Sequence, residues 1–255
     1  MMNCKFIGIA LLVFITSSGC FLDNKIDQAK NNEIKPEAFN VYQAGITGFS
    51  GICPGKVKDT FLAVSDKTGI FEIDKVGKII RKLPFSGSYD FESITINPAT
   101  NEVYLADEGQ MKIYKLSNDE KSIELITDVR VTGGVINKGI EGLTYGNDTL
   151  YIVNQESPTI MIKYDLKSRK ETARLAMNYV QFLSDIYYDG SDKTLWISDS
   201  KQQKFFHTDL NGNVIAFQSI PYIAKAEAIT VDSVAKIAWI GCDETGFLYK
   251  VRLEI

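Results

Sequence analysis

Short runs of alternating apolar and polar residues recur along the chain after residue 38, and they predict β-strands rather than helices. Residues 91–96 read FESITI and residues 102–106 read EVYLA, with the turn sequence NPATN between them. Alternation over five to seven residues, rich in Ile, Val, Thr, Tyr and Phe, is typical of strands that bury one face. Turn pairs such as Asn147-Asp148 and Asn211-Gly212 separate the runs where the chain must reverse. The pattern therefore predicts an all-β fold.

The same hairpin sequence returns at a nearly constant spacing. Later copies read GIEGLTYGNDTLYIVNQE (139–156) and AEAITVDSVAKIAWIGCDE (226–244). One aliphatic anchor residue in each copy sets the register, and successive anchors lie 42, 49, 43 and 43 residues apart. Such a period in a β-patterned chain is typical of a propeller with four strands in each blade. The anchors are Ile52, Ile94, Leu143, Ile186 and Ile229.

The last copy lacks a fourth strand, because the chain ends at Ile255 soon after GFLYKV (246–251). A missing strand would leave an exposed sheet edge. The segment AFNVYQA (38–44) has strand character, and we expect it to pair beside GFLYKV and close the ring. The sequence thus predicts a single five-bladed β-propeller over residues 38–255, with four-stranded blades and a ring closed by an N-terminal strand.

The first residues indicate export rather than fold. A basic residue, Lys5, precedes the apolar run 6–15, which is too short to cross a hydrocarbon core that needs about 20 residues. Small residues then lead to Cys20, and this arrangement resembles a lipobox, which implies cleavage before Cys20 and its lipidation. We therefore predict a lipoprotein signal peptide over residues 1–19, then the lipidated cysteine with a flexible tether to residue 37. An ordinary secretory signal is the alternative, since Ser17 stands where lipoboxes usually carry a large aliphatic residue.

The expected address is the outer membrane, facing the periplasm, because Phe21 rather than an aspartate follows Cys20. The net charge of −4 and the lack of basic runs argue against nucleic acid as a partner. Membrane contact should come from the lipid alone, and we expect a monomer. Two cysteines, Cys53 and Cys242, remain in the propeller. They are not spaced as a metal cage, so they form either a disulfide or two buried thiols.

Carboxylates recur at two fixed places in the repeat. Three copies carry glutamate two residues before the anchor, where the others carry serine, and the same three carry glutamate at the corner after the second strand. The start of the first strand and the end of the second lie at the same end of a hairpin, and first strands line the axis of a propeller. We therefore expect six glutamates to gather at one mouth of the channel. The inner three are Glu92, Glu141 and Glu227, and the outer three are Glu108, Glu156 and Glu244.

Clustered carboxylates raise one another's pKa unless a cation or hydrogen-bond donors lie among them. Hard oxygen ligands in this number suit Ca²⁺. The inner glutamates, Glu92, Glu141 and Glu227, are therefore the candidate Ca²⁺ ligands. The alternative is that such glutamates accept hydrogen bonds from amides of a neighbouring blade and act as latches. Lys67 and the aspartates that precede the corners are expected to face solvent or to hold turns.

The signatures SGI (50–52), FESI (91–94), GIEGL (139–143), LSDI (183–186) and AEAI (226–229) resemble the SdiA-regulated family. The corner phrases ADE (106–108) and CDE (242–244) do so as well. The likeness covers residues 41–255. It implies a five-bladed propeller, an extracytoplasmic setting and Ca²⁺ at the acidic mouth. It implies no defined reaction.

No catalytic constellation is visible in the sequence. The only histidine, His207, falls in KFFHTDL on an expected third strand, away from the axis. There is no GxSxG elbow, no HExxH and no phosphate-binding glycine loop. We therefore expect a lipid-anchored binding module that holds Ca²⁺ and takes a protein or a small cationic ligand. Tyr179 and Phe182 are candidate aromatic contacts for it, and packing in the core or at the rim is the alternative for both. A metal-dependent hydrolase of the gluconolactonase or phytase type and a structural envelope scaffold are the alternatives.

Overall fold

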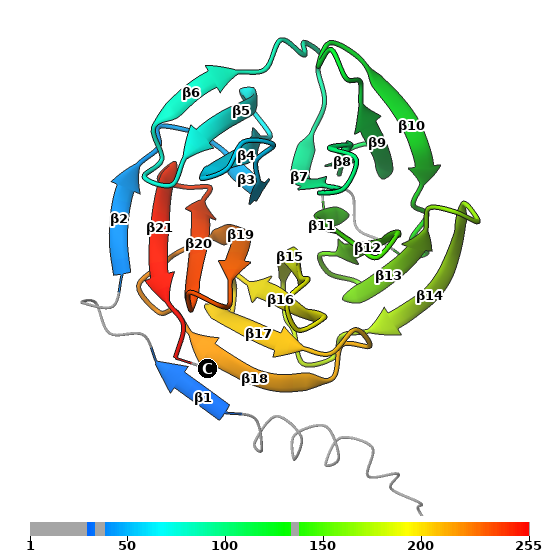
Figure 1. The fold of residues 1–255 in the computed structure, drawn as a ribbon. Coiled ribbons are helices and arrows are strands. Elements are labelled where there is room, and N and C mark those ends of the chain that lie inside the picture. Colours follow the sequence, from blue (N-terminus) through cyan, green and yellow to red (C-terminus); the bar gives the residue numbers. More distant parts are fainter. Residues whose placement is uncertain (1–29, 34–38, 134–137, 255) are drawn as a thin grey trace, which may run out of the picture.

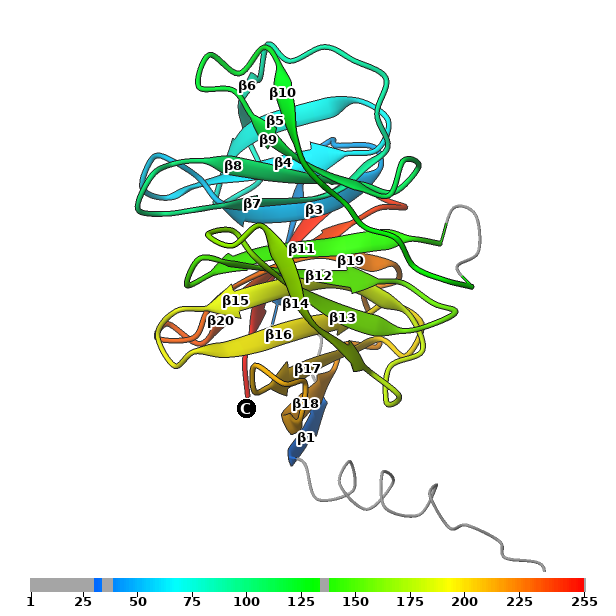
Figure 2. The same ribbon diagram turned by 90° about the vertical axis from the view of Figure 1, so that its right-hand side faces the viewer.

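The computed structural model describes residues 30–33, 39–133 and 138–254, and all its regular elements there are strands (Figure 1). Five sheets are arranged around a central axis and form a five-bladed propeller, as the repeat predicts. Figure 2 shows the same sheets from the side. Among the described residues, no helix is long and apolar enough to cross a membrane.

In each blade the first strand of the repeat lies at the axis, and the following strands of the repeat pair antiparallel outward from it (Figure 1). Blade 1 contains β3 (Phe49–Pro54), β4 (Thr60–Ser65), β5 (Gly69–Asp74) and β6 (Ile79–Lys82). Blade 2 contains β7 (Phe91–Ile96), β8 (Val103–Asp107), β9 (Lys112–Leu116) and β10 (Ile123–Asp128). Blade 3 contains β11 (Ile140–Gly146), β12 (Thr149–Asn154), β13 (Ile160–Asp165) and β14 (Lys170–Ala176).

Blades 4 and 5 each include a strand from the N-terminal region. Blade 4 contains β15 (Leu183–Asp189), β16 (Thr194–Asp199), β17 (Lys204–Thr208), β18 (Val214–Ser219) and, at its outer edge, β1 (Lys30–Glu33). Blade 5 contains β19 (Ala226–Asp232), β20 (Ile237–Cys242), β21 (Phe247–Arg252) and, outermost, β2 (Phe39–Gln43).

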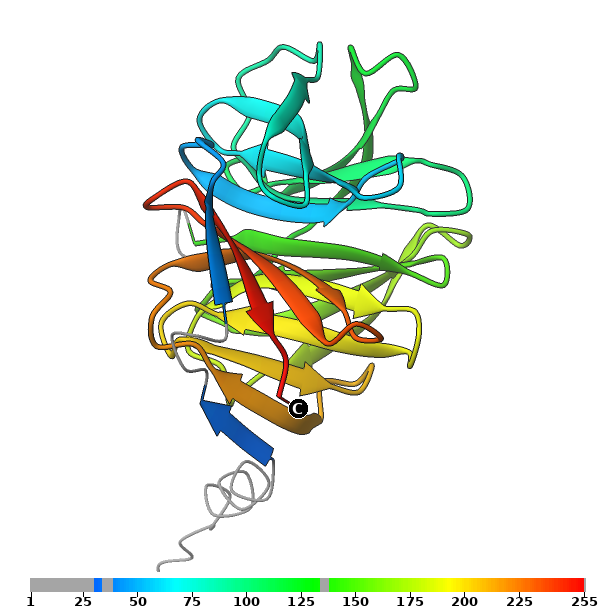
Figure 3. The same cartoon turned by 60° about the vertical axis from the view of Figure 1, so that its left-hand side comes forward.

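The N-terminal strand β2 closes the ring, as the missing fourth strand of blade 5 predicts. It pairs antiparallel with β21, from Phe39 opposite Val251 to Gln43 opposite Phe247 (Figure 3). Its Tyr42 packs on the core shared by blades 1 and 5, next to the buried Ala44. The expected closure is confirmed.

Part of the stretch expected as a tether has a place in the fold. β1 pairs in parallel with β18, with Lys30 opposite Ala216 and Glu33 opposite Ser219. The predicted signal peptide and Cys20 lie outside the described residues.

The core lies between neighbouring blades, because both faces of every sheet are covered. The five anchor residues are all buried on the inner strands, and these strands contact one another around the axis. Burial of one such aliphatic side chain stabilises the fold by roughly 1.5–3 kcal/mol. Cys53 and Cys242 are free thiols in two separate core clusters, which decides between the two alternatives for them.

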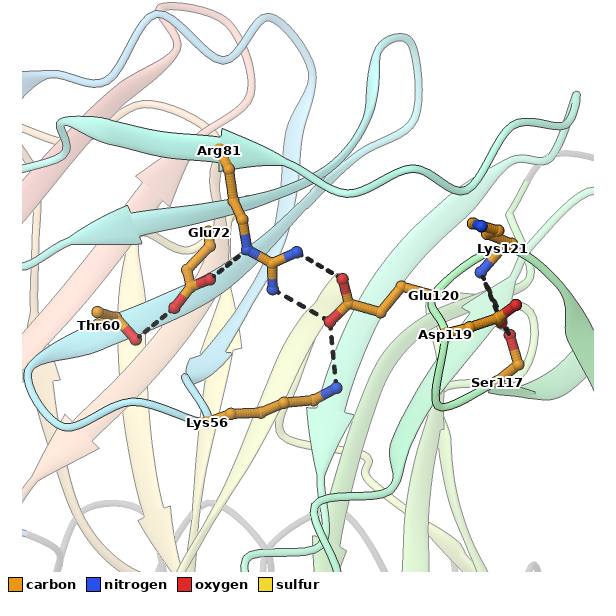
Figure 4. Close-up of polar contacts among 8 residues, drawn as sticks. All are labelled: Lys56, Thr60, Glu72, Arg81, Ser117, Asp119, Glu120 and Lys121. Atoms are coloured by element: carbon orange, nitrogen blue, oxygen red, sulfur yellow. Dashed lines mark hydrogen bonds and ion pairs between the residues drawn. The ribbon is translucent and has the colours of Figure 1, made fainter.

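A network of charged side chains joins the outer parts of blades 1 and 2, and we call it the polar lock (Figure 4). Its members are Lys56, Glu72, Arg81 and Glu120. Arg81 on β6 donates to Glu72 on β5 at 2.7 Å and to both oxygens of Glu120, in the turn between β9 and β10, at 2.5 and 3.1 Å. Lys56 also reaches Glu120, at 3.2 Å. Because Glu72 and Glu120 are buried, these donors compensate two carboxylates that have lost their water.

Candidate functional site

A β-bulge interrupts every inner strand at the same place. In β7 the pairing with β8 shifts between Phe91 and Ser93, so that Glu92 has no cross-strand partner. The shift recurs at the residue two before the anchor in the other four blades. A bulge bends its strand and re-aims the freed side chain. The five freed residues are Ser50, Glu92, Glu141, Ser184 and Glu227.

A cavity of about 640 Å³ lies at the end of the channel where these bulges occur, and we call it the mouth cavity. All three inner glutamates line it, as the sequence predicts. The remaining lining residues are Ser50, Asp66, Lys138, Gln155, Glu156, Phe182, Ser200, Lys201, Lys225 and Asp243.

The three outer glutamates have three different positions. Glu156 lines the mouth cavity and pairs with Lys138. Glu108 is buried and accepts a hydrogen bond from the amide of Gly139 at 2.7 Å, so it latches blade 2 to blade 3. Glu244 is exposed and lies outside the cavity. The latch alternative therefore describes Glu108.

Two aspartates expected to face solvent or hold turns are instead part of the mouth. Asp66 and Asp243 both line the cavity, and Lys67 lies 3.5 Å from the first and 3.6 Å from the second. The corresponding residues of blades 2 and 4, Asp107 and Asp199, hold turns as expected, since each accepts amide hydrogen bonds from the residues after its strand.

Asp66 and Glu92, which line the mouth cavity, lie close to Asp90, which does not line it, and we call these three residues the acidic centre. Within the described ranges, they are the group of three acidic residues in which one carboxylate oxygen of each lies within 4.8 Å of those of the other two. Oδ1 of Asp66 is buried and has no hydrogen-bond partner in the described part of the chain. Gly48, at φ +67°, leaves room for it, because a Cβ there would lie 1.7 Å from this oxygen. Of the predicted Ca²⁺ ligands, only Glu92 belongs to this group.

Burial governs the protonation of the inner glutamates. It raises the pKa of Glu92 to about 8, and the carboxylates of Asp90 and Glu108 add to this shift. It raises the pKa of Glu227 to about 7, with Asp243 as the next contribution. The pKa of Glu141 lies well above its usual range because of burial and the charges of Glu92 and Glu108. Without a cation, the mouth therefore holds protons that free glutamates would release near pH 4.5.

The wall formed by blades 3 and 4 is basic and aromatic. Nζ of Lys138 lies 5.3 Å and Nζ of Lys201 6.0 Å from the ring centroid of Phe182. Phe182 lines the cavity. Tyr179 does not, since its ring packs edge-on against Phe206 in the core, with centroids 5.0 Å apart.

A buried carboxyl group, which no motif in the sequence distinguishes, links the inner strands of three blades. Asp185 follows the bulge of β15 and accepts hydrogen bonds from Ser93 Oγ at 3.0 Å and from the amide of Ile229 at 2.8 Å. It thereby joins blades 2, 4 and 5, and its burial raises its pKa well above the usual range.

The only histidine lies away from this mouth, as expected. His207 on β17 stacks on Trp196 with ring centroids 4.4 Å apart, and its Nε2 lies 2.8 Å from Thr194 Oγ1.

The side chains that line the mouth cavity are carboxylates, lysines, serines, an amide and one phenyl ring. Its polar groups suit cation binding or carboxylate acid–base chemistry.

Comparisons with known proteins agree with this architecture. The model of the family described as SdiA-regulated matches residues 37–249. A crystal structure of glutaminyl cyclase from Myxococcus xanthus is similar with a TM-score of 0.66 and 11% identity, over 88% of this chain and 98% of the cyclase chain. A chain of the nidogen–laminin complex is similar with a TM-score of 0.55 and 14% identity, over 80% of this chain and 76% of that one. At these identities the likeness shows the fold alone. No curated protein matches the sequence.

Proposed function

The chain belongs to the SdiA-regulated family, and from this premise and the geometry of its mouth we propose that it is a binding module of the cell envelope that holds Ca²⁺ in the mouth cavity. The observation that carries the proposal is the acidic centre, with three carboxylates within 4.8 Å and one buried oxygen that has no partner among the described residues. Hard carboxylate oxygens are the ligands that Ca²⁺ prefers, at about 2.3–2.6 Å.

Asp66, Asp90 and Glu92 would hold the ion between blades 1 and 2. Glu141 and Glu227, the other two predicted ligands, line the same cavity from blades 3 and 5. The ion would supply positive charge to a site that otherwise keeps protons, and the cavity leaves room beside it for a small polar ligand or a partner loop. Lys138 and Lys201 on the facing wall are positively charged, so they favour a ligand that carries an anionic group.

The test is calorimetric titration of CaCl₂ into chelator-treated mature protein. We expect saturable binding that Glu92→Gln weakens at least tenfold, equivalent to about 1.4 kcal/mol. Glu244→Gln is the matched control and should bind as the wild type does, because Glu244 is exposed outside the cavity. The absence of saturable heat together with an unchanged melting temperature in Ca²⁺ would overturn the proposal.

The hydrolase and scaffold alternatives are separated by the same proteins. A hydrolase should release product from lactone or phosphate-ester substrates only with Ca²⁺ present, and lose this activity in Glu92→Gln. In a scaffold with a structural ion, Glu92→Ala combined with Glu141→Ala should unfold the protein rather than only abolish binding.

The lipobox-like sequence before Cys20 supports a proposal for the setting of this module. We infer that Cys20 carries lipid and holds the propeller at the outer membrane, facing the periplasm.

A further inference from the structure

A second cavity, of about 490 Å³, lies at the end of the channel opposite the mouth cavity. It is formed where β3, β15 and β19 end and where their turns into β4, β16 and β20 begin. Blades 1, 4 and 5 contribute its walls. We call it the lower cavity.

Aromatic and apolar side chains line much of the lower cavity. Phe61 and Trp239 pack with ring centroids 5.2 Å apart, and Tyr187 lies on the wall from blade 4. Val57 and Val234 stand at its rim with 59% and 86% of their surface exposed. Such a wall favours an apolar stem.

One acidic group in this wall is buried and incompletely paired. Asp189 is only 5% exposed, and its Oδ1 accepts a hydrogen bond from the amide of Ser191 at 2.9 Å. Its Oδ2 is also buried and has no partner among the residues that the structure describes. A buried carboxylate oxygen without a partner is costly, so its presence calls for an explanation.

The turn that begins at Asp189 does not require a carboxylate at this position. Asn97 holds the same position in blade 2, three residues after the anchor. Its Oδ1 accepts from the amide of Ala99 at 3.0 Å, and its carbonyl accepts from Asn101 at 2.8 Å. The carbonyl of Asp189 accepts from Lys193 at 2.9 Å in the same way. An amide therefore suffices for this turn, and the second carboxylate oxygen of Asp189 is not needed for it.

Among the described residues, no lysine or arginine forms an ion pair with Asp189, although Lys58 and Lys75 line the same cavity. Lys75 is engaged by Asp59, with Nζ and Oδ1 2.7 Å apart, and lies 5.3 Å from the Trp239 centroid. Burial lowers the pKa of His207 below its usual 6.5, so the imidazole is uncharged at neutral pH. The charged groups that line the cavity are three aspartates, Asp59, Asp189 and Asp232, against two lysines, Lys58 and Lys75.

We propose that the lower cavity binds a cationic nitrogen group, an ammonium or a guanidinium, carried on an apolar stem, with Asp189 as its counter-ion. The stem lies against Tyr187 and Trp239. A third cavity of about 340 Å³ shares Tyr187 and Gly190 with the lower cavity and continues towards Tyr145 and Tyr188, which gives a longer stem a place. A free amine and a lysine or arginine side chain of a peptide share this chemistry.

The test is an NMR titration of ¹⁵N-labelled protein in the presence of chelator, so that it does not depend on Ca²⁺ at the mouth. The probes are phenethylammonium chloride, its neutral counterpart phenethyl alcohol, and a capped peptide with a single arginine. We expect saturable shifts of the Trp239 indole and of the amides near Asp189 with a cationic probe and no saturation with the alcohol. Binding of the free amine identifies a small-molecule site, and binding of the peptide alone identifies a side-chain site.

Asp189→Asn is the decisive variant, because Asn97 shows that an amide supports the turn. We expect it to keep the wild-type melting temperature and to weaken cation binding at least tenfold. Asp192→Asn, in the same turn but 43% exposed at its side chain, should bind as the wild type does. Equal binding of amine and alcohol, unchanged affinity in Asp189→Asn, or no saturation by either cationic probe would overturn the proposal and leave water as the partner of Oδ2.

Discussion

Glu92, Glu141 and Glu227 owe their chemistry to a single extra residue in each inner strand. The bulge takes each glutamate out of the cross-strand pairing, and burial then makes its charged form costly. Serine at the same position in blades 1 and 4 adds no charge, so only three of the five bulges contribute a carboxylate.

Stability should depend on pH through these groups. Folded Glu92 and Glu227 keep their protons to about pH 8 and pH 7, whereas unfolded glutamates release them near 4.5. The folded state therefore binds more protons between these values, and the free energy of unfolding should fall as pH rises from about 5 to 8. Urea unfolding in chelator at pH 5.5 and 8.5 measures this, and Glu92→Gln should show a smaller decrease. A wild type that is more stable at pH 8.5 would contradict the prediction.

The repeat in the sequence was enough to place the inner glutamates at the mouth, but not Asp66 and Asp90. These two belong to loops of different blades, and their approach depends on how blades 1 and 2 pack. Asp189 was not recognised either, because a turn aspartate is common and only burial shows that one of its oxygens has no partner in the described chain.

Among the elements, the strands and their order follow from the sequence, and the bulges were also encoded there. In FESI, two residues separate Phe91 from Ile94, whereas strict alternation allows one. The same spacing stands at the start of each inner strand, and it signals one extra residue.

The polar lock between blades 1 and 2 gives a prediction at this scale. Arg81→Met removes the donors to Glu72 and Glu120 and leaves both buried carboxylates with less compensation. We expect a loss of about 1–3 kcal/mol in unfolding free energy, less than for a fully buried pair because the Arg81 side chain is 42% exposed.

Arg174→Met is the matched control for chemical denaturation of the Arg81 variant. Arg174 pairs with Glu171 on the exposed strand β14, and its loss should cost less than about 0.5 kcal/mol. Equal effects of the two substitutions would show that the lock contributes no more than a surface pair.

Closure of the ring by β2 is testable by truncation. A protein that starts at residue 45 lacks the strand that covers β21, and a protein that starts at residue 30 retains it. We expect the shorter protein to melt roughly 10 °C or more below the longer one, because each 1 kcal/mol shifts melting by about 2–4 °C at this size. Addition of a synthetic peptide of residues 38–46 should restore part of the loss. Equal melting temperatures would refute closure by β2.

For the whole molecule, the prediction concerns the membrane anchor. We expect cells that express the full chain to incorporate labelled palmitate into it, and Cys20→Ala to abolish labelling and retain the signal peptide. Cys4→Ala is the control, since Cys4 lies within the predicted signal peptide. Labelling that persists in Cys20→Ala would rule out the lipobox.

The closure of the ring also determines when its first and last strands can pair. β2 is among the first strands to leave the ribosome, yet its partner β21 is synthesised about 200 residues later. At roughly 5–20 residues per second, the first strand waits on the order of 10–40 seconds for the last. Blades 1 to 4 can each form hairpins as they emerge in the envelope after the proposed export, whereas blade 5 is completed only when both ends of the domain are available. An unfinished chain therefore has an unpaired sheet edge, and the ring can close only after the last blade has been synthesised.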